Sequence, residues 1–250
     1  MLVFERFAVP GRIGPVSCGF QPGRLTCLLG PNGSGKSSLL AGAAGLLSGE
    51  GGVSLDGRRL ERYELAELAR RRAMLGQQQT MPLGLRGFEL LALGAEPIGG
   101  VTEAVCLAIA DLTEPLGLSG LFERTVSSLS GGEQQRLMIA KAMIQVSPSV
   151  NDQARLLLLD EPLASLDWQH QLSVLRVLQQ LSRQGLAVAV SIHDINLACH
   201  YGDELWCLKQ GQLVARGGPE VITSVLIEQV FGVRTRLLEQ DGSQVFMPLD

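Results

Sequence analysis

A glycine-rich segment that contains a lysine carries the clearest chemistry in the sequence. Residues 30–37 read GPNGSGKS and follow a short apolar run. Glycines let successive backbone N–H groups turn toward one point, and a helix that begins after the last glycine adds partial positive charge, so the segment predicts a phosphate site. We expect Lys36 to reach the outer phosphates and Ser37 to coordinate magnesium. The residues expected to bind nucleotide are Gly30, Pro31, Asn32, Gly33, Ser34, Gly35, Lys36, Ser37 and Ser38. The alternative is a glycine-rich turn that binds nothing.

Two adjacent carboxylates supply acid and base chemistry. Asp160 and Glu161 follow the apolar run LLLL. Asp160 can hold a magnesium ion, and Glu161 beside it can polarise an attacking water. His193 follows another apolar run, in SIHD. Because the carboxyl ends of neighbouring parallel strands meet at one edge of a sheet, His193 is expected near the same site, in contact with the terminal phosphate. The alternatives are a solvated strand end and a structural histidine.

Residues 128–143, SLSGGEQQRLMIAKAM, predict a helix whose first turn holds two glycines. Ser130 and Glu133 fit a capping box. Gly131 and Gly132 each weaken a helix by up to about 1 kcal/mol relative to alanine, and capping alone gives no reason for them. Bare backbone, free N–H groups and the helix dipole all suit a phosphate. One triphosphate hardly needs two helix N-termini. If the second belongs to a partner subunit, two chains would sandwich two nucleotides, which spacing alone does not decide.

The elements that position these residues are predicted to be buried strands with helices between them. Continuous apolar runs at residues 25–29, 156–162 and 186–194 are typical of strands covered on both faces, as in parallel sheets. Residues 168–182 have a helical apolar stripe, and a hairpin is expected to turn at Gln210 and Gly211. The fold class is therefore α/β, with a mostly parallel core sheet and additional antiparallel strands.

Residues 80–146 differ from the rest of the chain because their recurring patterns are helical. We interpret them as an inserted helical subdomain. Residues 1–79 and 147–250 then form the nucleotide-binding core, with a β subdomain and a C-terminal tail, and the whole chain is one domain.

Composition limits the classes of function. The chain is 46% hydrophobic and 18% charged, which is typical of a globular protein. Its net charge of −4 argues against a broad nucleic-acid-binding face, and ARRRA at residues 69–73 is expected to be a solvated face. No apolar stretch is long enough to span a membrane and no signal peptide is evident, so the chain is expected to be cytoplasmic and soluble. The five cysteines are interpreted as reduced core residues, and the dispersed histidines indicate no metal cluster.

The order GPNGSGKS, LSGGEQQR, LLLLDEP, SLD and SIHD resembles that of ATP-binding-cassette (ABC) ATPases over most of the chain. The resemblance implies the ABC-ATPase variant of the P-loop NTPase fold, with ATP and Mg²⁺ as ligands. By this resemblance, the signature motif contacts the ATP of the opposite subunit and consists of Leu129, Ser130, Gly131, Gly132 and Glu133. The dimer-contact loop consists of Ser165, Leu166 and Asp167.

Gln77, in AMLGQQQT, resembles the glutamine that links the active site to the membrane partner, although Gln78 and Gln79 leave its register open. The resemblance makes Gln77 catalytic together with Glu161 and His193, where His193 matches the switch histidine. It also places Gln77 with Ser37 and Asp160 at the magnesium ion, partly through water.

Longer segments, among them GQQQTMP and VSPSVNDQARLLLLDEP, resemble those of the ATPase subunits of bacterial cobalamin importers. The ATPase subunits of haem and iron-siderophore importers are similar. This implies a peripheral homodimer on the cytoplasmic side of the inner membrane, which serves two polytopic permeases and, indirectly, a periplasmic binding protein. A soluble cassette ATPase for iron-sulfur assembly or repair, or a small-molecule kinase, are the alternatives. The family usually stacks an aromatic residue on adenine. Phe4 and Phe7 suit the core better, and the guanidinium of Arg12 could stack instead.

Overall fold

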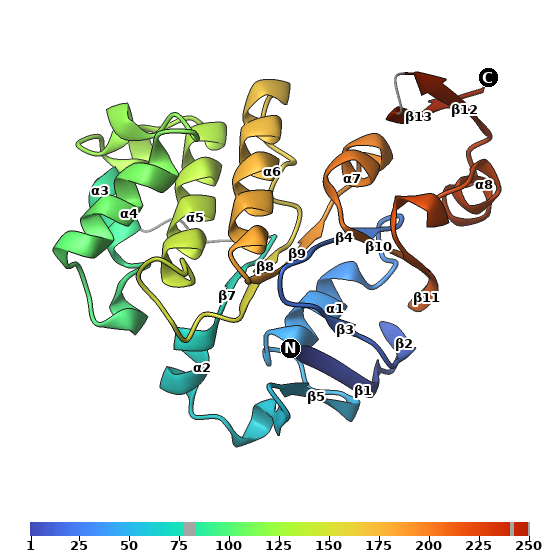
Figure 1. Cartoon of the computed structure of the whole chain (residues 1–250), viewed down its shortest axis with the longest axis horizontal. Helices are drawn as coiled ribbons and strands as arrows, with labels where there is room; N and C mark the ends of the chain where they lie inside the picture. Colours follow the sequence, from blue (N-terminus) through green and yellow to red (C-terminus); the bar gives the residue numbers. More distant parts are fainter. Residues whose placement is uncertain (78–83, 241–242, 250) are drawn as a thin grey trace.

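A six-stranded sheet organises the molecule, which we describe from a computed structural model that covers residues 1–77, 84–240 and 243–249 (Figure 1). The strand order is β11-β10-β4-β9-β8-β7. These strands are β4 (Leu25–Leu29), β7 (Arg72–Leu75), β8 (Leu156–Leu159), β9 (Ala187–Ser191), β10 (Glu204–Lys209) and β11 (Gln212–Gly217). All neighbours are parallel except β10 and β11. Every residue of β4, β8 and β9 is buried, which confirms the interpretation of the continuous apolar runs.

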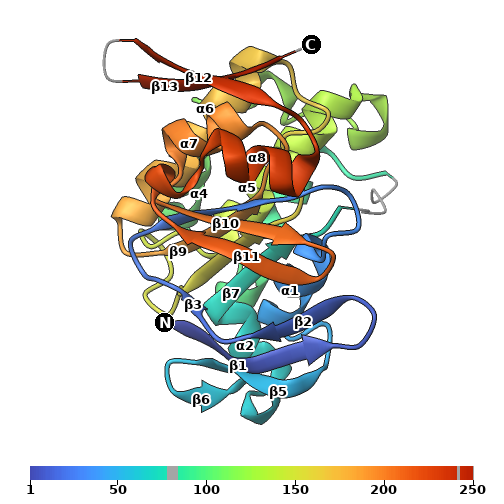
Figure 2. The same cartoon turned by 90° about the vertical axis from the view of Figure 1, so that its right-hand side faces the viewer.

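An antiparallel sheet lies at the end of the molecule opposite the C-terminus (Figure 2). The sequence patterns did not predict its individual strands. It comprises β1 (Leu2–Val9), β2 (Ile13–Val16), β3 (Gly19–Phe20), β5 (Glu50–Leu55) and β6 (Arg58–Arg59). Phe4 and Phe7 are only 1% and 2% exposed, and Phe4 packs edge-on against Phe20 and Trp206. Both phenylalanines are therefore core residues, as expected, and are not available to stack on a base.

Helices make up the side of the molecule that contains α3 (Gly87–Ala92), α4 (Glu103–Thr113) and α5 (Gly131–Gln145) (Figure 1). Short 3-10 turns link them: η2 (Glu96–Ile98), η3 (Ser119–Leu121) and η4 (Val126–Ser128). Among residues 84–146, β pairing is limited to the single bridge between Arg86 and Thr125. Buried side chains of α3, α4 and α5 join the same hydrophobic cluster as β4 and β8. The division into a core and an inserted subdomain stays a prediction, and residues 80–83 lie outside the described residues.

The remaining helices cover the sheets or connect strands. They are α1 (Lys36–Ala43), η1 (Leu60–Arg62), α2 (Leu65–Arg71), α6 (Trp168–Arg183), α7 (Ile195–Tyr201), η5 (Pro219–Val221) and α8 (Ser224–Phe231). The predicted helix over residues 168–182 corresponds to α6. The predicted turn between β10 and β11 is also confirmed, because Gln210 and Gly211 both adopt positive φ, at 48° and 77°. Among the described residues, no helix combines the length and the apolar character needed to cross a membrane.

Two expectations about local environment were wrong. The ARRRA segment is a helix–strand junction, since α2 ends at Arg71 and β7 begins at Arg72, and both arginines are half-buried. Arg71 pairs with Glu67 at 3.2 Å, and Arg72 begins a strand that pairs with the buried strand β8. Cys106 is exposed on α4 and is not a core residue. Cys199, by contrast, is half-buried, and burial raises the pKa of its thiol to about 11.

A C-terminal hairpin of β12 (Thr235–Gln240) and β13 (Ser243–Pro248) packs on α7, outside both larger sheets (Figures 1 and 2). The side-chain amide of Asn196 makes the connection. Its Nδ2 donates to the Phe246 carbonyl at 3.2 Å, and the Phe246 N–H donates to its Oδ1 at 2.8 Å. The Phe246 ring is buried against the main core. Among the described residues, the Phe246 ring and the Asn196 amide thus attach the hairpin to the rest of the molecule.

Candidate active site

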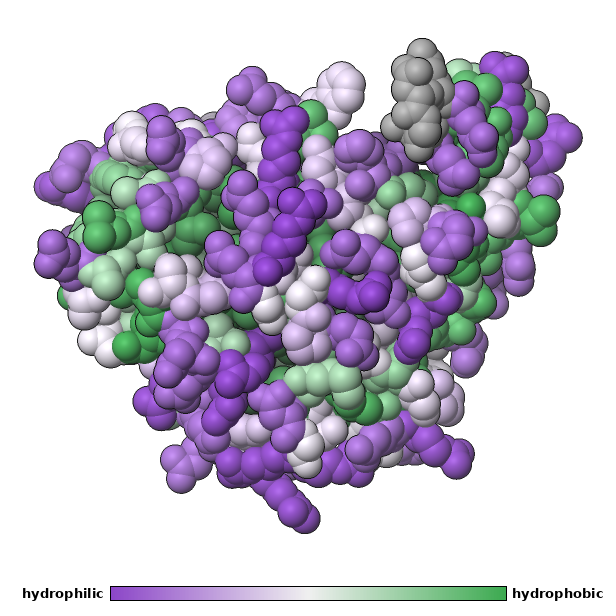
Figure 3. All heavy atoms as spheres, viewed as in Figure 1, coloured by the Kyte–Doolittle hydropathy of each residue, from purple (hydrophilic) through white to green (hydrophobic). Residues whose placement is uncertain are grey.

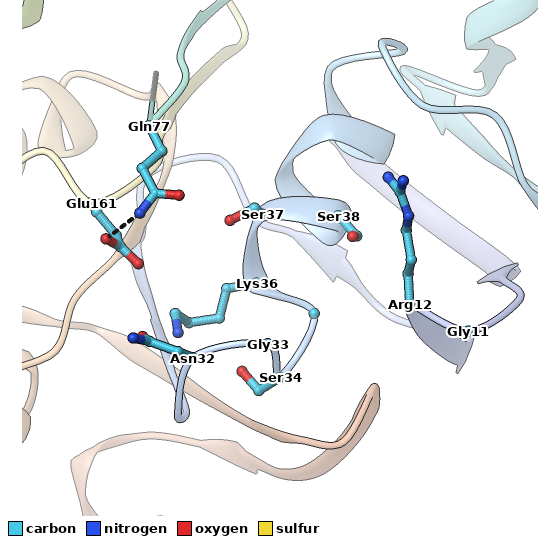
Figure 4. Close-up of a pocket in the computed structure, with 11 residues that line it drawn as sticks. Gly11, Arg12, Asn32, Gly33, Ser34, Lys36, Ser37, Ser38, Gln77 and Glu161 are labelled. Carbon is cyan, nitrogen blue, oxygen red and sulfur yellow. Dashed lines mark hydrogen bonds between the residues drawn. The ribbon is translucent and has the colours of Figure 1, made fainter. Parts of the chain in front are cut away.

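A cleft of about 510 Å³ opens where the phosphate loop meets the ends of β7 and β8 (Figure 4). It is lined by Gly11, Arg12, Asn32, Gly33, Ser34, Gly35, Lys36, Ser37, Ser38, Gln77 and Glu161. Figure 4 shows Gln77 and Glu161 on one side of the loop and Arg12 on the other. The structure therefore brings together most of the predicted nucleotide-binding residues and two of the three predicted catalytic residues.

The phosphate loop depends on glycine at its two ends. Gly30 has φ +149°, and a Cβ there would lie 2.3 Å from the Leu208 carbonyl oxygen. Gly35 has φ +104°, and its Cβ would lie 2.9 Å from the Arg12 carbonyl oxygen. Gly35 is also the N-cap of α1, so no side chain occupies the first N–H groups of that helix. These N–H groups and the helix dipole make an anion site at the base of the cleft.

Lys36 is the buried cation of the cleft. Its Nζ donates to the carbonyl oxygens of Gly30 at 2.7 Å and Pro31 at 3.2 Å. Burial lowers the pKa of the ammonium, and the negative charges of Glu161 and Asp160 act in the opposite direction. A buried ammonium group whose hydrogen bonds go to neutral carbonyl oxygens is suited to bind an anionic ligand.

Asp160 and Glu161 leave the sheet directly after β8, and Ser191 at the end of β9 contacts both. Asp160 is 3% exposed and accepts a hydrogen bond from Ser191 Oγ at 2.8 Å. The backbone N–H of Glu161 donates to the same Oγ at 2.6 Å. Glu161 has φ +50°. A left-handed conformation costs a residue with a side chain about 1 to 2 kcal/mol, so the surrounding contacts must hold it in place.

Two further side chains hold the Glu161 carboxylate. Gln77 Nε2 donates to Glu161 Oε2 at 2.8 Å (Figure 4), and His193 Nε2 lies 2.9 Å from Oε1. The Glu161 side chain is 14% exposed. His193 does not line the main cleft. It lies with Glu161 beside a smaller cavity of about 140 Å³. In this structure the His193 ring therefore contacts the Glu161 carboxylate and does not line the phosphate cleft.

The donor set fits magnesium only if a phosphate completes it. Within the described residues, no three His, Cys, Asp or Glu side chains gather as a metal cage. Asp160 instead supplies one buried carboxylate, of which Ser191 occupies only one oxygen, and Ser37 supplies a hydroxyl in the cleft. Mg²⁺ prefers oxygen ligands, and in nucleotide sites it takes one or two from the protein and the rest from phosphates and water. The residues present therefore fit a magnesium nucleotide.

The predicted signature motif lies outside the cleft. Ser130 is the N-cap of α5, and it forms the predicted capping box with Glu133. No described atom lies within 4 Å of a Cβ built on Gly131. A Cβ on Gly132, by contrast, would lie 3.2 Å from the Ser165 carbonyl oxygen of the same chain. Close approach within the chain thus gives a reason for the second glycine but none for the first. Leu129, which precedes the motif, is buried.

The predicted dimer-contact loop packs beside this helix start. Asp167 is the N-cap of α6, where its Oδ1 accepts from the His170 N–H at 2.9 Å. The backbone hydrogen bond from His170, followed by the contact with its ring, lowers the pKa of Asp167. Gln171 Nε2 donates to the carbonyl oxygens of Leu163 and Leu166, and Leu166 is buried. Helix capping alone therefore accounts for Asp167 within one chain, and Ser165 beside it is exposed.

Sequence reasoning missed Ser191, and it left the role of Arg12 open. Ser191 is the polar residue at the end of an otherwise apolar run, two residues before His193, and that position was the available signal. Arg12 lines the phosphate cleft and an adjoining cleft of about 550 Å³. The second cleft also contains Pro10, Gln210 and Gln212, and it is wide enough to hold part of a ligand whose phosphates occupy the first.

The chain is similar to known proteins over most of its length. The family model described as ABC transporter matches residues 13–164. The vitamin B12 import ATP-binding protein BtuD of Citrobacter koseri is 41% identical over 248 residues, covering 99% of this chain and 98% of that protein. The same-named protein of Pectobacterium atrosepticum is 43% identical over 232 residues, or 92% of each chain. A solved structure described as an inward-facing conformation of a putative metal-chelate type ABC transporter matches with a TM-score of 0.79 at 22% identity, covering 100% of this chain and 97% of that one.

Proposed function

The chain belongs to the ABC transporter family, and on that premise we propose that it is the ATP-hydrolysing subunit of a vitamin B12 importer. Members of this family bind and hydrolyse ATP. The proposed cargo is supported by relatives named for vitamin B12 import that match almost the whole chain at 41% and 43% identity. The observation that carries the proposed chemistry is the convergence of Gln77 and His193 on the Glu161 carboxylate beside the phosphate loop.

The phosphate loop binds the triphosphate in this proposal. The N–H groups at the start of α1 and the buried ammonium of Lys36 receive its negative charge. Ser37, Asp160 and Gln77 would hold magnesium, in part through water. The bound ion would supply neutralisation of the phosphate charge in the transition state.

Glu161 acts as the general base that orients and deprotonates the attacking water. Its carboxylate has a fixed direction, because one oxygen accepts from Gln77 and the other faces His193. Its side chain is nearly enclosed, so bulk water competes little for the proton. His193 holds the carboxylate from the side opposite Gln77, and after closure of the site it reaches the terminal phosphate.

A second copy of the chain completes each site. Gly131 stands in open space in the first turn of α5, and its bare backbone supports close approach by the phosphate bound to the other copy. Leu129, Ser130 and Glu133 support this helix start. The loop that contains Asp167 packs against Gly132, so it lies at the same interface. Two nucleotides are then sandwiched between two chains.

The proposed assembly is peripheral to the bacterial inner membrane on its cytoplasmic side. Two ATPase subunits serve two polytopic permease subunits, which receive vitamin B12 from a periplasmic binding protein. The cargo passes through the permeases and does not contact this chain. An importer of haem or of an iron-siderophore chelate is the second candidate, since a solved structural neighbour is described as of metal-chelate type.

Replacement of the proposed base tests the enzymatic part of this function. Glu161→Gln keeps the shape of the side chain and removes its proton affinity, so ATP binding is expected to persist while kcat falls by about a hundredfold or more. The exposed Glu228 on α8 provides the matched control, Glu228→Gln, which should hydrolyse ATP at the wild-type rate. Near-normal turnover by Glu161→Gln would remove Glu161 from the catalytic role.

The cargo is tested separately. The chain is introduced into bacteria that lack their own vitamin B12 import ATPase but keep its permease and binding protein. Uptake of labelled vitamin B12 should return with the wild-type chain and not with Glu161→Gln. If the wild-type chain binds no permease and hydrolyses ATP in the soluble fraction only, the importer proposal fails and a soluble cassette ATPase is favoured.

A further inference from the structure

Ser191 connects the two acidic residues of the active site through one hydroxyl group. It is the last residue of β9, and β9 is the strand directly beside β8, which ends before Asp160. Its Oγ accepts from the backbone N–H of Glu161 and donates to Asp160 Oδ1, at 2.6 and 2.8 Å. A serine hydroxyl can donate one hydrogen bond, and Ser191 donates it to Asp160. At 0% exposure, Ser191 is not accessible to water that could substitute for either contact.

The contact at Glu161 is to its backbone, which is where the residue is strained. The φ of +50° is the rotation about the N–Cα bond of Glu161, and the N–H at one end of that bond donates to Ser191 Oγ. The direction of the side chain follows from the direction of the backbone. Ser191 therefore helps to determine where the Glu161 carboxylate meets Gln77 and His193. Since His193 lies only two residues beyond Ser191, the same strand end supplies both constraints on Glu161.

We propose that Ser191 is a positioning residue for ATP hydrolysis, which holds the backbone of Glu161 and one carboxylate oxygen of Asp160 so that the base and the magnesium ligand keep a fixed relative geometry. The inference rests on the proposed role of Glu161. Ser191 does not line the phosphate cleft, so its contribution is to kcat and to the magnesium requirement and not to the affinity for ATP.

Thr26, on the neighbouring strand β4, is a control for Ser191. It shows whether any buried hydroxyl in this sheet affects the rate, or only one that bonds to the active-site residues. Thr26 is also 0% exposed, and it is paired with Ala189 on β9. Within the described part of the chain its Oγ1 has no hydrogen-bond partner. The sheet thus contains one buried hydroxyl that bonds two active-site residues and another, two residue pairs away, that bonds none.

The experiment compares Ser191→Ala, Ser191→Cys and Ser191→Thr with Thr26→Val in the full-length protein. Ser191→Ala removes both hydrogen bonds and is expected to lower kcat by about tenfold or more, with Kd for ATP within about threefold of wild type. The magnesium concentration at half-maximal rate should rise. Ser191→Thr keeps the hydroxyl and should retain most of the rate. Thr26→Val, which removes a hydroxyl that has no hydrogen-bond partner among the described residues, should leave kcat unchanged. Melting temperatures identify the folded variants.

A double-variant comparison shows whether Ser191 acts through Glu161. In the Glu161→Gln background, Ser191→Ala should cause little further loss, because the group that it positions is already gone. A folded Ser191→Ala protein with kcat within twofold of wild type overturns the inference, and so does a full multiplicative loss in the Glu161→Gln background. If Ser191→Ala does not fold, Ser191→Cys decides, since its weakly bonding thiol must also lower kcat. Normal hydrolysis by Glu161→Gln alone would instead contradict the proposed base, and the two failures are thereby distinguished.

Discussion

Arg12 is the one side chain, among the residues that the structure describes, that borders both the phosphate cleft and the cleft beside it, and base recognition is expected to depend on it. A guanidinium plane stacked on a purine contributes about 0.5 to 1 kcal/mol at an exposed position. Arg12→Ala should therefore raise the Kd for ATP by about two- to fivefold. Binding of inorganic tripolyphosphate, which has no base, should not change.

Calorimetric titration of both ligands measures this effect. Arg24→Ala is the matched control, because Arg24 is also exposed but precedes β4, at the end of the strand away from the phosphate loop. Equal weakening of ATP and tripolyphosphate by Arg12→Ala would mean that Arg12 binds phosphate and not the base.

At the scale of residues, the sequence predicted which residues take part in the chemistry, but it did not predict most of the contacts between them. The phosphate loop and the Asp160–Glu161 pair are short patterns whose residue types state their own role. The hydrogen bonds of Ser191 and the contact of His193 with Glu161 depend on which strands are neighbours. No spacing along the chain contains that information. The capping role of Asp167 was local and could have been predicted from its position directly before a helix.

At the scale of elements, the start of α5 gives the sharpest test of a composite site. Gly131→Asp adds a carboxylate in open space, and an acidic residue in the first turn favours the helix, so the chain should fold and bind ATP. Hydrolysis should nevertheless fall by about tenfold or more, because the added negative charge faces the phosphate of the other copy. Gly132 is the less suitable position, since its Cβ would press on the Ser165 carbonyl oxygen.

Steady-state ATPase rates and nucleotide affinity check this prediction. Gly120→Asp is the matched control, since Gly120 is also exposed, in a short helical turn, and has no described atom within 4 Å of its Cβ. If Gly131→Asp hydrolyses ATP as fast as Gly120→Asp, α5 is only a capped helix and serves no second nucleotide.

The elements that the sequence predicted correctly are those with a clear pattern of apolar residues. β4, β8, β9 and α6 have uninterrupted apolar runs or a clear helical stripe. β7 was missed because Arg72 and Met74 alternate with buried Ala73 and Leu75 over only four residues. The strands of the N-terminal sheet were missed because they are short or interrupted by a bulge, as between Phe7 and Val9 in β1. Their pairing, and not their sequence, determines where they begin and end.

At the scale of the whole molecule, mixing of two inactive variants tests the exchange of parts between copies. Lys36→Ala damages the phosphate loop and Gly131→Asp damages the opposing helix start. In a mixed dimer both changes fall in one composite site and the other site is intact. Random mixing makes half of the dimers mixed, so activity should return to about a quarter of the wild-type rate, or less if the sites act together. Were each site contained in one chain, mixing would restore nothing.

The attachment of the C-terminal hairpin has a consequence for how the molecule opens. An isolated two-stranded hairpin is marginally stable in water, and this one is joined to α7 chiefly by the Phe246 ring and the Asn196 amide pair. It should form a separate cooperative unit that unfolds before the sheets do. In hydrogen-exchange mass spectrometry, the amides of β12 should exchange well ahead of those of β10, which lies between two strands of the main sheet. Simultaneous exchange of both strands would show that the hairpin and the core unfold together.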